Sequence, residues 1–241
     1  MKLGPIFLRA LPIMAAGLLL SACGVNLINL GPAPNLYDLS PQETFTDLPK
    51  VNWQLVIEEP EAPNVIDTDH ILARSSGYEV KYIANARWTD RAPRLVQTLL
   101  VHAFDRSNSI VGVGRQAIGL RSDYSLKGEL QHFEADYSKG PVPSVHVVLN
   151  LKIVRQPSEM IVAARTFDED IPASRTSMTA IAGAFQEALG KILTQVVPWT
   201  LTEANADYDR RLEQRRSPEP MHSNGLSGAT VGSSPAVGAA N

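Results

Sequence analysis

Hydrophobic and polar residues alternate in several short stretches of the chain, a pattern typical of half-buried strands. In the stretch 51–57 every odd-numbered residue is apolar, although Val56 is apolar as well. The same alternation predicts strands at 78–83, 110–113, 145–153 and 160–167. A turn containing Pro157 joins the last two stretches, so we expect them to form a hairpin.

One longer apolar stretch changes its parity. Residues 124–130 carry their large apolar side chains at even positions, whereas residues 133–137 carry them at odd positions. Successive side chains of a strand point to opposite faces, so an unbroken strand could not bury both sets. The sequence therefore predicts a long strand with a bulge or bend near Gln131–His132.

Two further stretches have the three-and-four spacing of amphipathic helices. The first covers 92–104, with Asp90 as the expected N-cap and Pro93 in the first turn, where its missing N–H costs little. The second covers 178–196 and is expected to stop at Pro198. These elements predict an α+β fold, a two-layer sandwich in which two amphipathic helices pack on a mostly antiparallel sheet.

The first 22 residues have the layout of a secretory signal peptide. Lys2 and Arg9 precede an apolar run at 10–20, which has about half of the roughly 20 apolar residues that a transmembrane helix needs. Leu20-Ser21-Ala22-Cys23 resembles the lipobox of bacterial lipoprotein precursors. The resemblance implies cleavage before Cys23 and acylation of its thiol. The alternatives are a plain secretory signal with a chance cysteine, or a buried free thiol.

The chain after the signal peptide is expected to have three parts. Segment 23–35 contains Gly31, Pro32 and Pro34 and is predicted to be a lipidated tether reaching roughly 40 Å from the lipid. Residues 36–202 form the folded domain. In segment 203–241, charged residues predict a solvated helical extension, and a Pro-, Ser-, Gly- and Ala-rich end predicts disorder. A solvated end is favoured there over an arm that touches a partner.

Charge and cysteine content exclude several classes of function. The chain has 22 basic and 25 acidic residues, and removal of Lys2 and Arg9 would leave 20 basic residues. This acidic balance argues against binding nucleic acid, which requires a clustered basic face. A single cysteine excludes an internal disulfide and a zinc site of the Cys-x-x-Cys kind.

Three segments resemble the ABC-type transport auxiliary lipoprotein family, which serves MCE-type lipid transport systems. The segments are 78–82 with 86–88 and 93–97, 120–126 with 129–130 and 133–135, and 184–185 with Leu189, Leu193 and Trp199. The resemblance implies a sandwich similar to the amino-terminal domain of the Tol-system periplasmic protein. It also implies three partners: an MCE-family substrate-binding protein, an ABC permease and its ATPase.

The lipobox and this resemblance together imply a periplasmic lipoprotein that is not an enzyme and that binds the MCE component of a transporter of phospholipids or sterol-like lipids. No phosphate-binding loop for ATP and no nucleophile elbow are present, and no cofactor is expected. The alternatives are a lipid-binding envelope lipoprotein, an assembly factor outside an ABC system, and an envelope hydrolase. Gly24 favours the outer membrane over the inner, by a sorting rule of some Gram-negative bacteria. Exposed sheet edges would allow a homo-oligomer.

Two groups of residues are candidates for binding. Arg87 and Trp88 are predicted to contact a partner, because Arg and Trp dominate interface hot spots. The alternative is that Trp88 covers the core and Arg87 pairs with a carboxylate such as Asp90. His132 and His146, with Glu134 and Asp136 nearby, could bind a metal. Histidines on a strand face are more often simply exposed, so no metal is expected.

Overall fold

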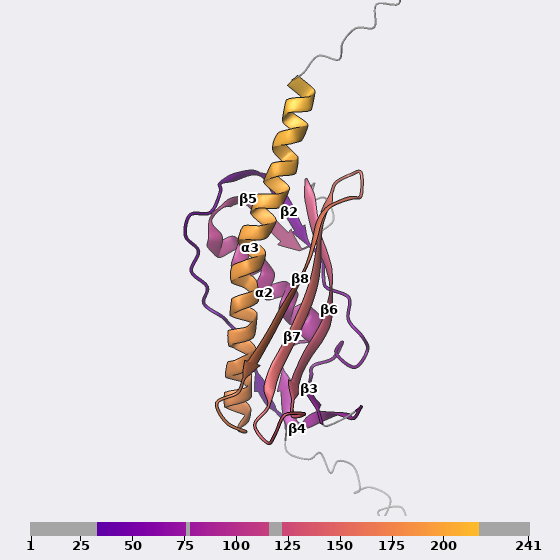
Figure 1. The fold of residues 1–241 in the computed structure, drawn as a ribbon, viewed down its shortest axis with the longest axis vertical. Coiled ribbons are helices and arrows are strands. Elements are labelled where there is room, and N and C mark those ends of the chain that lie inside the picture. The colour runs from indigo at the N-terminus through magenta and orange to yellow at the C-terminus, as the bar shows by residue number, and fades with distance from the viewer. Residues whose placement is uncertain (1–32, 76–77, 116–121, 217–241) are drawn as a thin grey trace, which may run out of the picture.

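The computed structural model of the protein describes residues 33–75, 78–115 and 122–216, which form one curled sheet and two helices (Figure 1). The elements are β1 (Asn35–Tyr37), β2 (Val51–Ile57), β3 (His70–Arg74), β4 (Val80–Trp88), α2 (Ala92–Ser107), β5 (Ile110–Arg115), β6 (Tyr124–Asp136), β7 (Ser144–Arg155), β8 (Met160–Pro172) and α3 (Met178–Arg216). The predicted signal peptide, Cys23, most of the tether and the segment from 217 onward lie outside the described residues.

The long strand β6 organises the sheet. One edge of β6 pairs with β7 along its whole length, and β7 pairs in turn with β8. The other edge of β6 is shared by β2 at its first residues and β3 at its last, both in parallel orientation. The sheet continues through β2 to β5 and through β3 to β4 and β1. The prediction of a mostly antiparallel sheet therefore holds for β6–β7–β8 and for β3–β4, whereas the remaining pairings are parallel.

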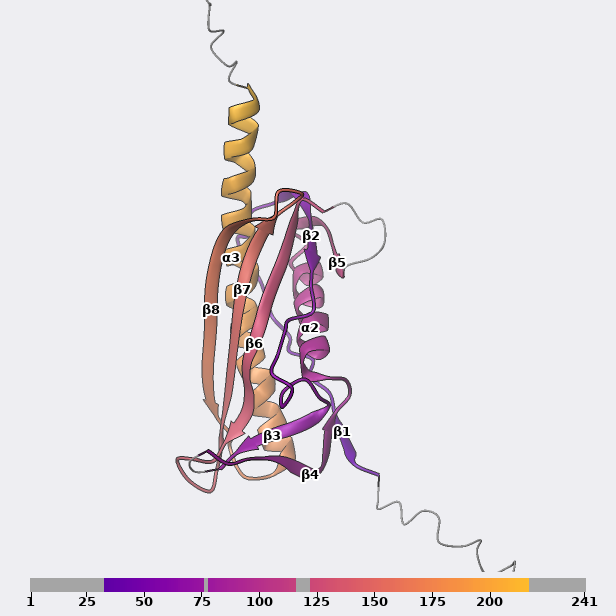
Figure 2. The same ribbon diagram turned by 90° about the vertical axis from the view of Figure 1, so that its right-hand side faces the viewer.

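The two helices lie together on the side of the sheet that carries the core (Figure 2). Helix α3 contacts β7 and β8, α2 contacts β5 and β2, and the helices also contact each other. Between them and the sheet lie large buried side chains, of which the biggest are Trp53, Trp88, Tyr124, Phe104, Phe133, Phe167 and Phe185. The mixed α+β class is confirmed. A regular two-layer sandwich and the likeness to the Tol-system domain stay predictions.

The predicted irregularity of the long strand is confirmed. The β6–β7 register shifts between Leu130 and His132, so both sets of apolar residues reach the core. The predicted hairpin is confirmed as β7 and β8. Strands β1 and β3 were not expected, because β1 has only three residues, and in β3 the adjacent residues Ile71 and Leu72 are both buried, which hides the alternation.

The start of α2 differs from the expectation in one respect. Pro93 lies in the first turn, as predicted. Asp90 is not the N-cap, however, because Arg91 occupies that position and no side chain caps the helix. Asp90 instead accepts a hydrogen bond from the Arg91 backbone N–H at 2.8 Å and pairs with Arg94 at 3.1 Å. The carboxylate therefore holds the residues around the helix start rather than the free N–H groups of the first turn.

The expected stop at Pro198 is wrong, since α3 continues through this residue to Arg216. A proline inside a helix costs about 3 kcal/mol, because it removes a hydrogen bond and its ring crowds the preceding turn. Burial beyond Pro198 offsets that cost: Leu201 and Ala204 are in the core. Asp207 is buried too, where it accepts hydrogen bonds from the Tyr124 hydroxyl at 2.9 Å and from Arg155 at 3.1 Å.

Candidate partner-binding site

Trp88 ends β4 and points into the core. Its side chain is 1% exposed, and its ring packs edge-on against Phe185 at 4.9 Å and tilted against Phe133 at 5.5 Å between centroids. A side chain buried in this way has no surface to offer another protein. Trp88 therefore belongs to the core, as the alternative predicted, and has no exposed surface for the predicted partner contact.

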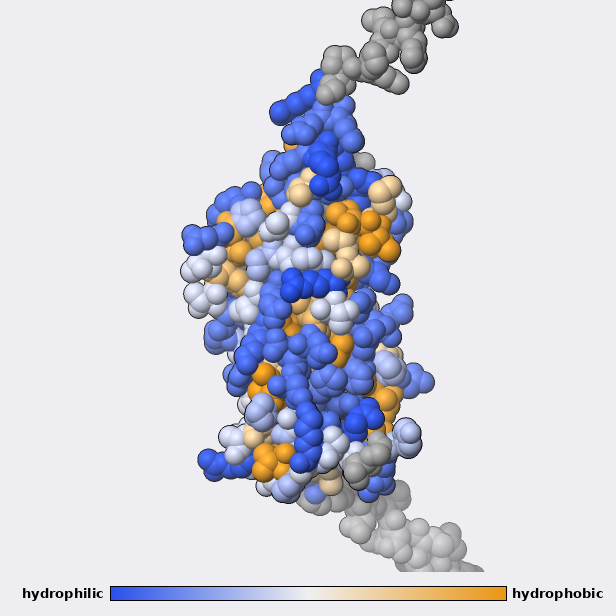
Figure 3. All heavy atoms as spheres, in the orientation of Figure 1, coloured by the Kyte–Doolittle hydropathy of each residue, from blue (hydrophilic) through white to orange (hydrophobic). Residues whose placement is uncertain are grey.

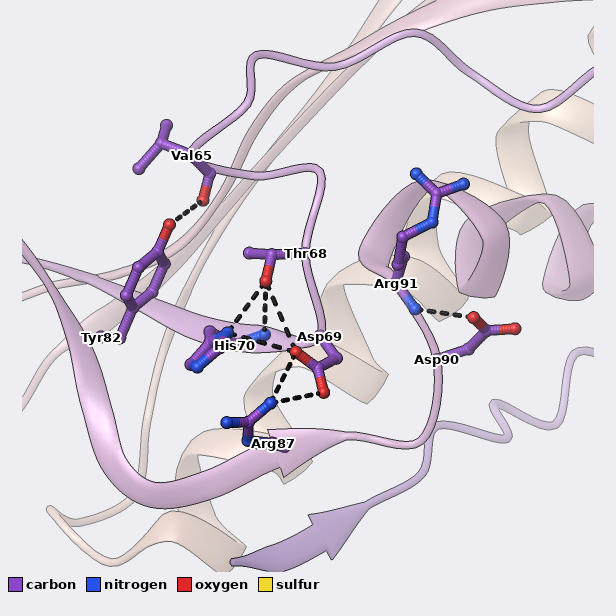
Figure 4. Close-up of polar contacts among 8 residues, drawn as sticks. All are labelled: Val65, Thr68, Asp69, His70, Tyr82, Arg87, Asp90 and Arg91. Carbon is purple, nitrogen blue, oxygen red and sulfur yellow. Dashed lines mark hydrogen bonds and ion pairs between the residues drawn. The ribbon is translucent and has the colours of Figure 1, made fainter.

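Arg87 lies beside Trp88 but points to the opposite face of β4, and it is partly exposed. Its Nη1 donates hydrogen bonds to both carboxylate oxygens of Asp69, at 3.1 and 2.9 Å (Figure 4). The hydrogen bond from Arg87 holds the pKa of Asp69 below its ordinary value of 3.8. Arg87 therefore pairs with a carboxylate, as the alternative predicted, but the partner is Asp69 rather than Asp90.

A small polar cluster surrounds this ion pair; we call Thr68, Asp69, His70, Tyr82 and Arg87 the Arg87 cluster. The Thr68 hydroxyl lies 2.9 Å from Nδ1 of His70, and the His70 ring packs on the Tyr82 ring at 4.8 Å between centroids. Figure 4 shows these side chains gathered where β3 runs beside β4. The sequence pointed to Arg87 alone, because the other members depend on the unexpected strand β3.

Three members of the Arg87 cluster line an open groove of about 440 Å³. Its walls include His70, Tyr82 and Arg87, together with Pro34 just before β1. The groove therefore lies where the chain enters the folded domain. It offers an imidazole, a phenol ring and a guanidinium, which are groups that hold a partner by hydrogen bonds and ring contacts.

A second set of ion pairs fixes the loop between β2 and β3. Arg91 pairs with Glu59 and with Asp67, and its guanidinium points away from Arg87 (Figure 4). Since Asp67 and Asp69 belong to the same loop, two arginines hold that loop against the end of β4 and the start of α2. The loop before β3 is thereby tied at two points.

The structure also brings together most of the residues that the sequence named as possible metal ligands. His132, Glu134 and His146 lie on neighbouring strands, and each offers a ligand atom within 4.8 Å of the others. Asp136 is not part of this group, since its carboxylate accepts hydrogen bonds from the backbone N–H and hydroxyl of Ser138. Two further neighbours were not expected: Arg74 lies beside Glu134, and Asp168 lies beside His146.

Within the described part of the chain, neither helix has a stretch long and apolar enough to cross a membrane.

Known proteins resemble both the sequence and the fold. A model of the ABC-type transport auxiliary lipoprotein component matches residues 36–197. An uncharacterized protein of Bradyrhizobium diazoefficiens is 25% identical over 166 residues, which cover 68% of this chain and 44% of that protein. The chain thus spans less than half the length of this relative.

Two crystal structures have a related fold. A Xanthomonas campestris protein of the family DUF330 is 32% identical, with a TM-score of 0.69, over 73% of this chain and 99% of that one. An uncharacterized protein shares the fold with a TM-score of 0.55 at 15% identity, over 68% of this chain and 97% of its own. The chain belongs to the family of ABC-type transport auxiliary lipoprotein components.

Proposed function

We propose that the protein is a membrane-anchored periplasmic lipoprotein that binds the MCE component of an ABC-type lipid transporter and acts without catalysing a reaction. One observation carries the proposal: a transport auxiliary domain over 36–197 follows a lipobox at 20–23 that lies outside the matched region. The two signals are independent, and together they favour a transport component fixed to a membrane by acyl chains.

Anchoring through Cys23 would keep the domain close to the lipid. Each buried methylene of an acyl chain contributes about 0.8 kcal/mol, and two or more chains give stable attachment. The tether between Cys23 and β1 reaches roughly 40 Å when fully extended. Gly24 after the cysteine favours the outer membrane. A domain held in this way acts on what it can touch near that membrane.

The sheet offers two kinds of contact to a partner. Strand β8 has thirteen residues and pairs only with β7 among the described strands, so its outer edge is free to accept a strand of another chain. Its first residues, Met160 and Ile161, are exposed apolar side chains near the β7–β8 turn. Either the MCE component or a second copy of this chain could pair there. The groove lined by His70, Tyr82 and Arg87 offers a separate, polar contact.

The grooves of the described residues favour contact with a protein over storage of a lipid. The groove of about 480 Å³ between the segment after β1 and α3 is lined by charged and amide side chains that include Glu43, Gln186, Glu187 and Lys191. Acyl chains bind in pockets lined mostly by apolar and aromatic residues. A lipid-binding role would need a different cavity.

Purification of the native complex tests the proposal. The wild-type protein, extracted in mild detergent, is expected to bring down the MCE protein, the permease and the ATPase. The Cys23→Ser variant is expected to leave the membrane fraction, whereas Ser21→Ala, which keeps a small residue in the lipobox, should stay in it. Recovery of none of the three partners with the wild-type protein would contradict the transport role, and membrane retention of Cys23→Ser would contradict the anchor.

A further inference from the structure

The face of β6–β7–β8 turned away from the helices carries a compact group of histidines and carboxylates. Phe133, Val147 and Phe167 point into the core, so the residues next to them in sequence, His132, His146 and Asp168, point to the other face. Glu134 lies directly opposite His146, and Val148 separates His132 from Asp168 in the neighbouring row. Three strands thus bring four possible metal ligands to one patch.

The two imidazoles lie close together on this patch. Their ring centroids are 4.7 Å apart and the rings are tilted by 30°. An imidazole nitrogen is the commonest protein ligand of divalent transition metals, so two rings at this distance can serve one ion.

Each histidine is next to a carboxylate. Nδ1 of His132 lies 3.2 Å from Oε1 of Glu134. Nε2 of His146 lies 3.0 Å from Oδ1 of Asp168, which favours a proton on that nitrogen and leaves Nδ1 of His146 with a lone pair. His146, which donates one N–H to Asp168 and presents its other nitrogen, has the usual arrangement of a histidine around a bound metal ion.

Glu134 is unusually buried for an acidic residue on an open sheet face. Its side chain is 2% exposed, and Arg74 donates two hydrogen bonds to it, at 2.6 and 3.2 Å. A carboxylate has lone pairs for about four contacts, so these bonds leave it able to bind an ion as well. Arg74 also holds the carboxylate in place, although its positive charge weakens the attraction for a cation.

We propose that His132, Glu134 and His146 bind a divalent transition-metal ion, with Zn²⁺ the best fit to two nitrogens and one carboxylate oxygen. Bonds of about 2.0–2.1 Å place two ligands of a tetrahedral ion about 3.3 Å apart, close to the present distance between His132 and Glu134. His146 must move closer by at most about 1.5 Å, because all three ligand atoms lie within 4.8 Å of one another. Both imidazoles are partly exposed, so side-chain rotation supplies this movement.

Such an ion would join β6 to β7, with water in the remaining position. Asp168 would act as a positioning residue, holding Nε2 of His146 while Nδ1 faces the ion. The sequence favoured simple exposure of these histidines. The structure supports the alternative of metal binding. It shows the register of β6 and β7, the burial of Glu134 and the carboxylate beside each imidazole.

Metal titration of the mature full-length chain, in detergent and with a purification tag free of histidine, tests the site. Calorimetry with Zn²⁺ is expected to show one ion per chain. His132→Gln and His146→Gln should abolish that binding, and Asp168→Asn should weaken it about tenfold or more. His102→Gln, which changes an exposed histidine on α2, is the matched control and should bind as the wild type does.

A second measurement avoids variants that fold poorly. Electron paramagnetic resonance of the wild-type chain with one equivalent of Cu²⁺ should show coupling to two nitrogens, one from each imidazole. Absence of Zn²⁺ binding, a spectrum with fewer nitrogens, or an equal loss of affinity in His102→Gln would each overturn the site. Unfolding temperatures measured without metal show whether the variants keep their fold.

Discussion

Arg87 acts on its surroundings through Asp69, whose carboxylate takes both hydrogen bonds of the guanidinium nitrogen Nη1. The ion pair connects the end of β4, which lines the groove, to the loop that precedes β3. Both side chains are more than a third exposed, at 38% and 37%, so water screens their attraction. The pair is therefore a modest source of stability that also positions the groove.

Replacement of Arg87 should make stability depend less on pH. Asp69 has a lowered pKa in the folded protein because of the hydrogen bond from Arg87. A lowered folded pKa contributes stability above the unfolded pKa, and this contribution is lost as pH falls through the folded pKa. Arg87→Ala should thus lower the free energy of unfolding near neutral pH, by at most about 1 kcal/mol, with the difference shrinking as pH falls below 3.8.

Urea unfolding of both proteins between neutral and acid pH measures this difference. Arg175→Ala, which changes an exposed arginine between β8 and α3, serves as the control and should follow the wild type at every pH. A difference between Arg87→Ala and wild type that stays constant down to the lowest pH would show that Asp69 is not the group responsible.

Helix α3 owes its length to residues on both sides of Pro198. The face that packs on β7 and β8 continues beyond the proline with Thr200, Leu201 and Ala204, all buried. Asp207 then completes the contact, because its carboxylate accepts hydrogen bonds from Tyr124 and Arg155. Burial and the hydrogen bond to Asp207 raise the pKa of Tyr124, so this phenol keeps its proton and remains a donor.

Truncation of Leu201 should destabilise the protein as strongly as truncation of a core residue. Leu201 is fully buried, and removal of a buried leucine side chain to alanine costs about 2–5 kcal/mol. Thr202→Ala, at the exposed neighbouring position, should change the free energy of unfolding by less than about 0.5 kcal/mol. Denaturant unfolding of the two variants decides the matter; equal small effects would mean that the helix does not pack past Pro198.

At the level of elements, periodicity predicted what depends on local pattern and missed what depends on distant contacts. The bulge at Leu130–His132 shows in the sequence, because the apolar residues change from even to odd positions there and only a bulge lets both sets reach one core. Charged residues from 203 predicted a helical extension, but the continuity of the helix through Pro198 does not show, because its buried contacts are with β6 and β7, far away in the sequence. Strands β1 and β3 do not show either, because β1 has only three residues and β3 lacks a clear alternation, so Asp69 and His70 of the Arg87 cluster were missed as well.

The whole molecule is elongated, and its two ends differ. Strand β1 and the connection between β6 and β7 lie at one end, while the β7–β8 turn and the end of α3 lie at the other (Figure 2). The last turns of α3 project beyond the sheet and are hydrophilic on the face seen in Figure 3. Since the tether precedes β1, the end with β1 is the one that the proposed anchor would hold near the lipid.

Exposed apolar residues at the β1 end suit a position near lipid headgroups. Leu36 of β1, Tyr78 just before β4 and Val142 of the β6–β7 connection are all exposed. Tyrosine favours the boundary between water and hydrocarbon, because its ring is apolar and its hydroxyl is polar. The domain is therefore expected to stand with β1 toward the membrane and the β7–β8 turn away from it.

Fluorescence quenching in vesicles tests this orientation. Ser138→Cys, in the β6–β7 connection, and Ser158→Cys, in the β7–β8 turn, place a label at either end of β7, whose twelve residues span roughly 40 Å. Acylation would leave Cys23, the only native cysteine, unable to react with the label. A nitroxide on lipid headgroups should quench the label at 138 strongly and the label at 158 weakly, because quenching is short-ranged. Equal quenching would mean that the domain lies flat, and stronger quenching at 158 would mean that it stands with the β7–β8 turn toward the membrane.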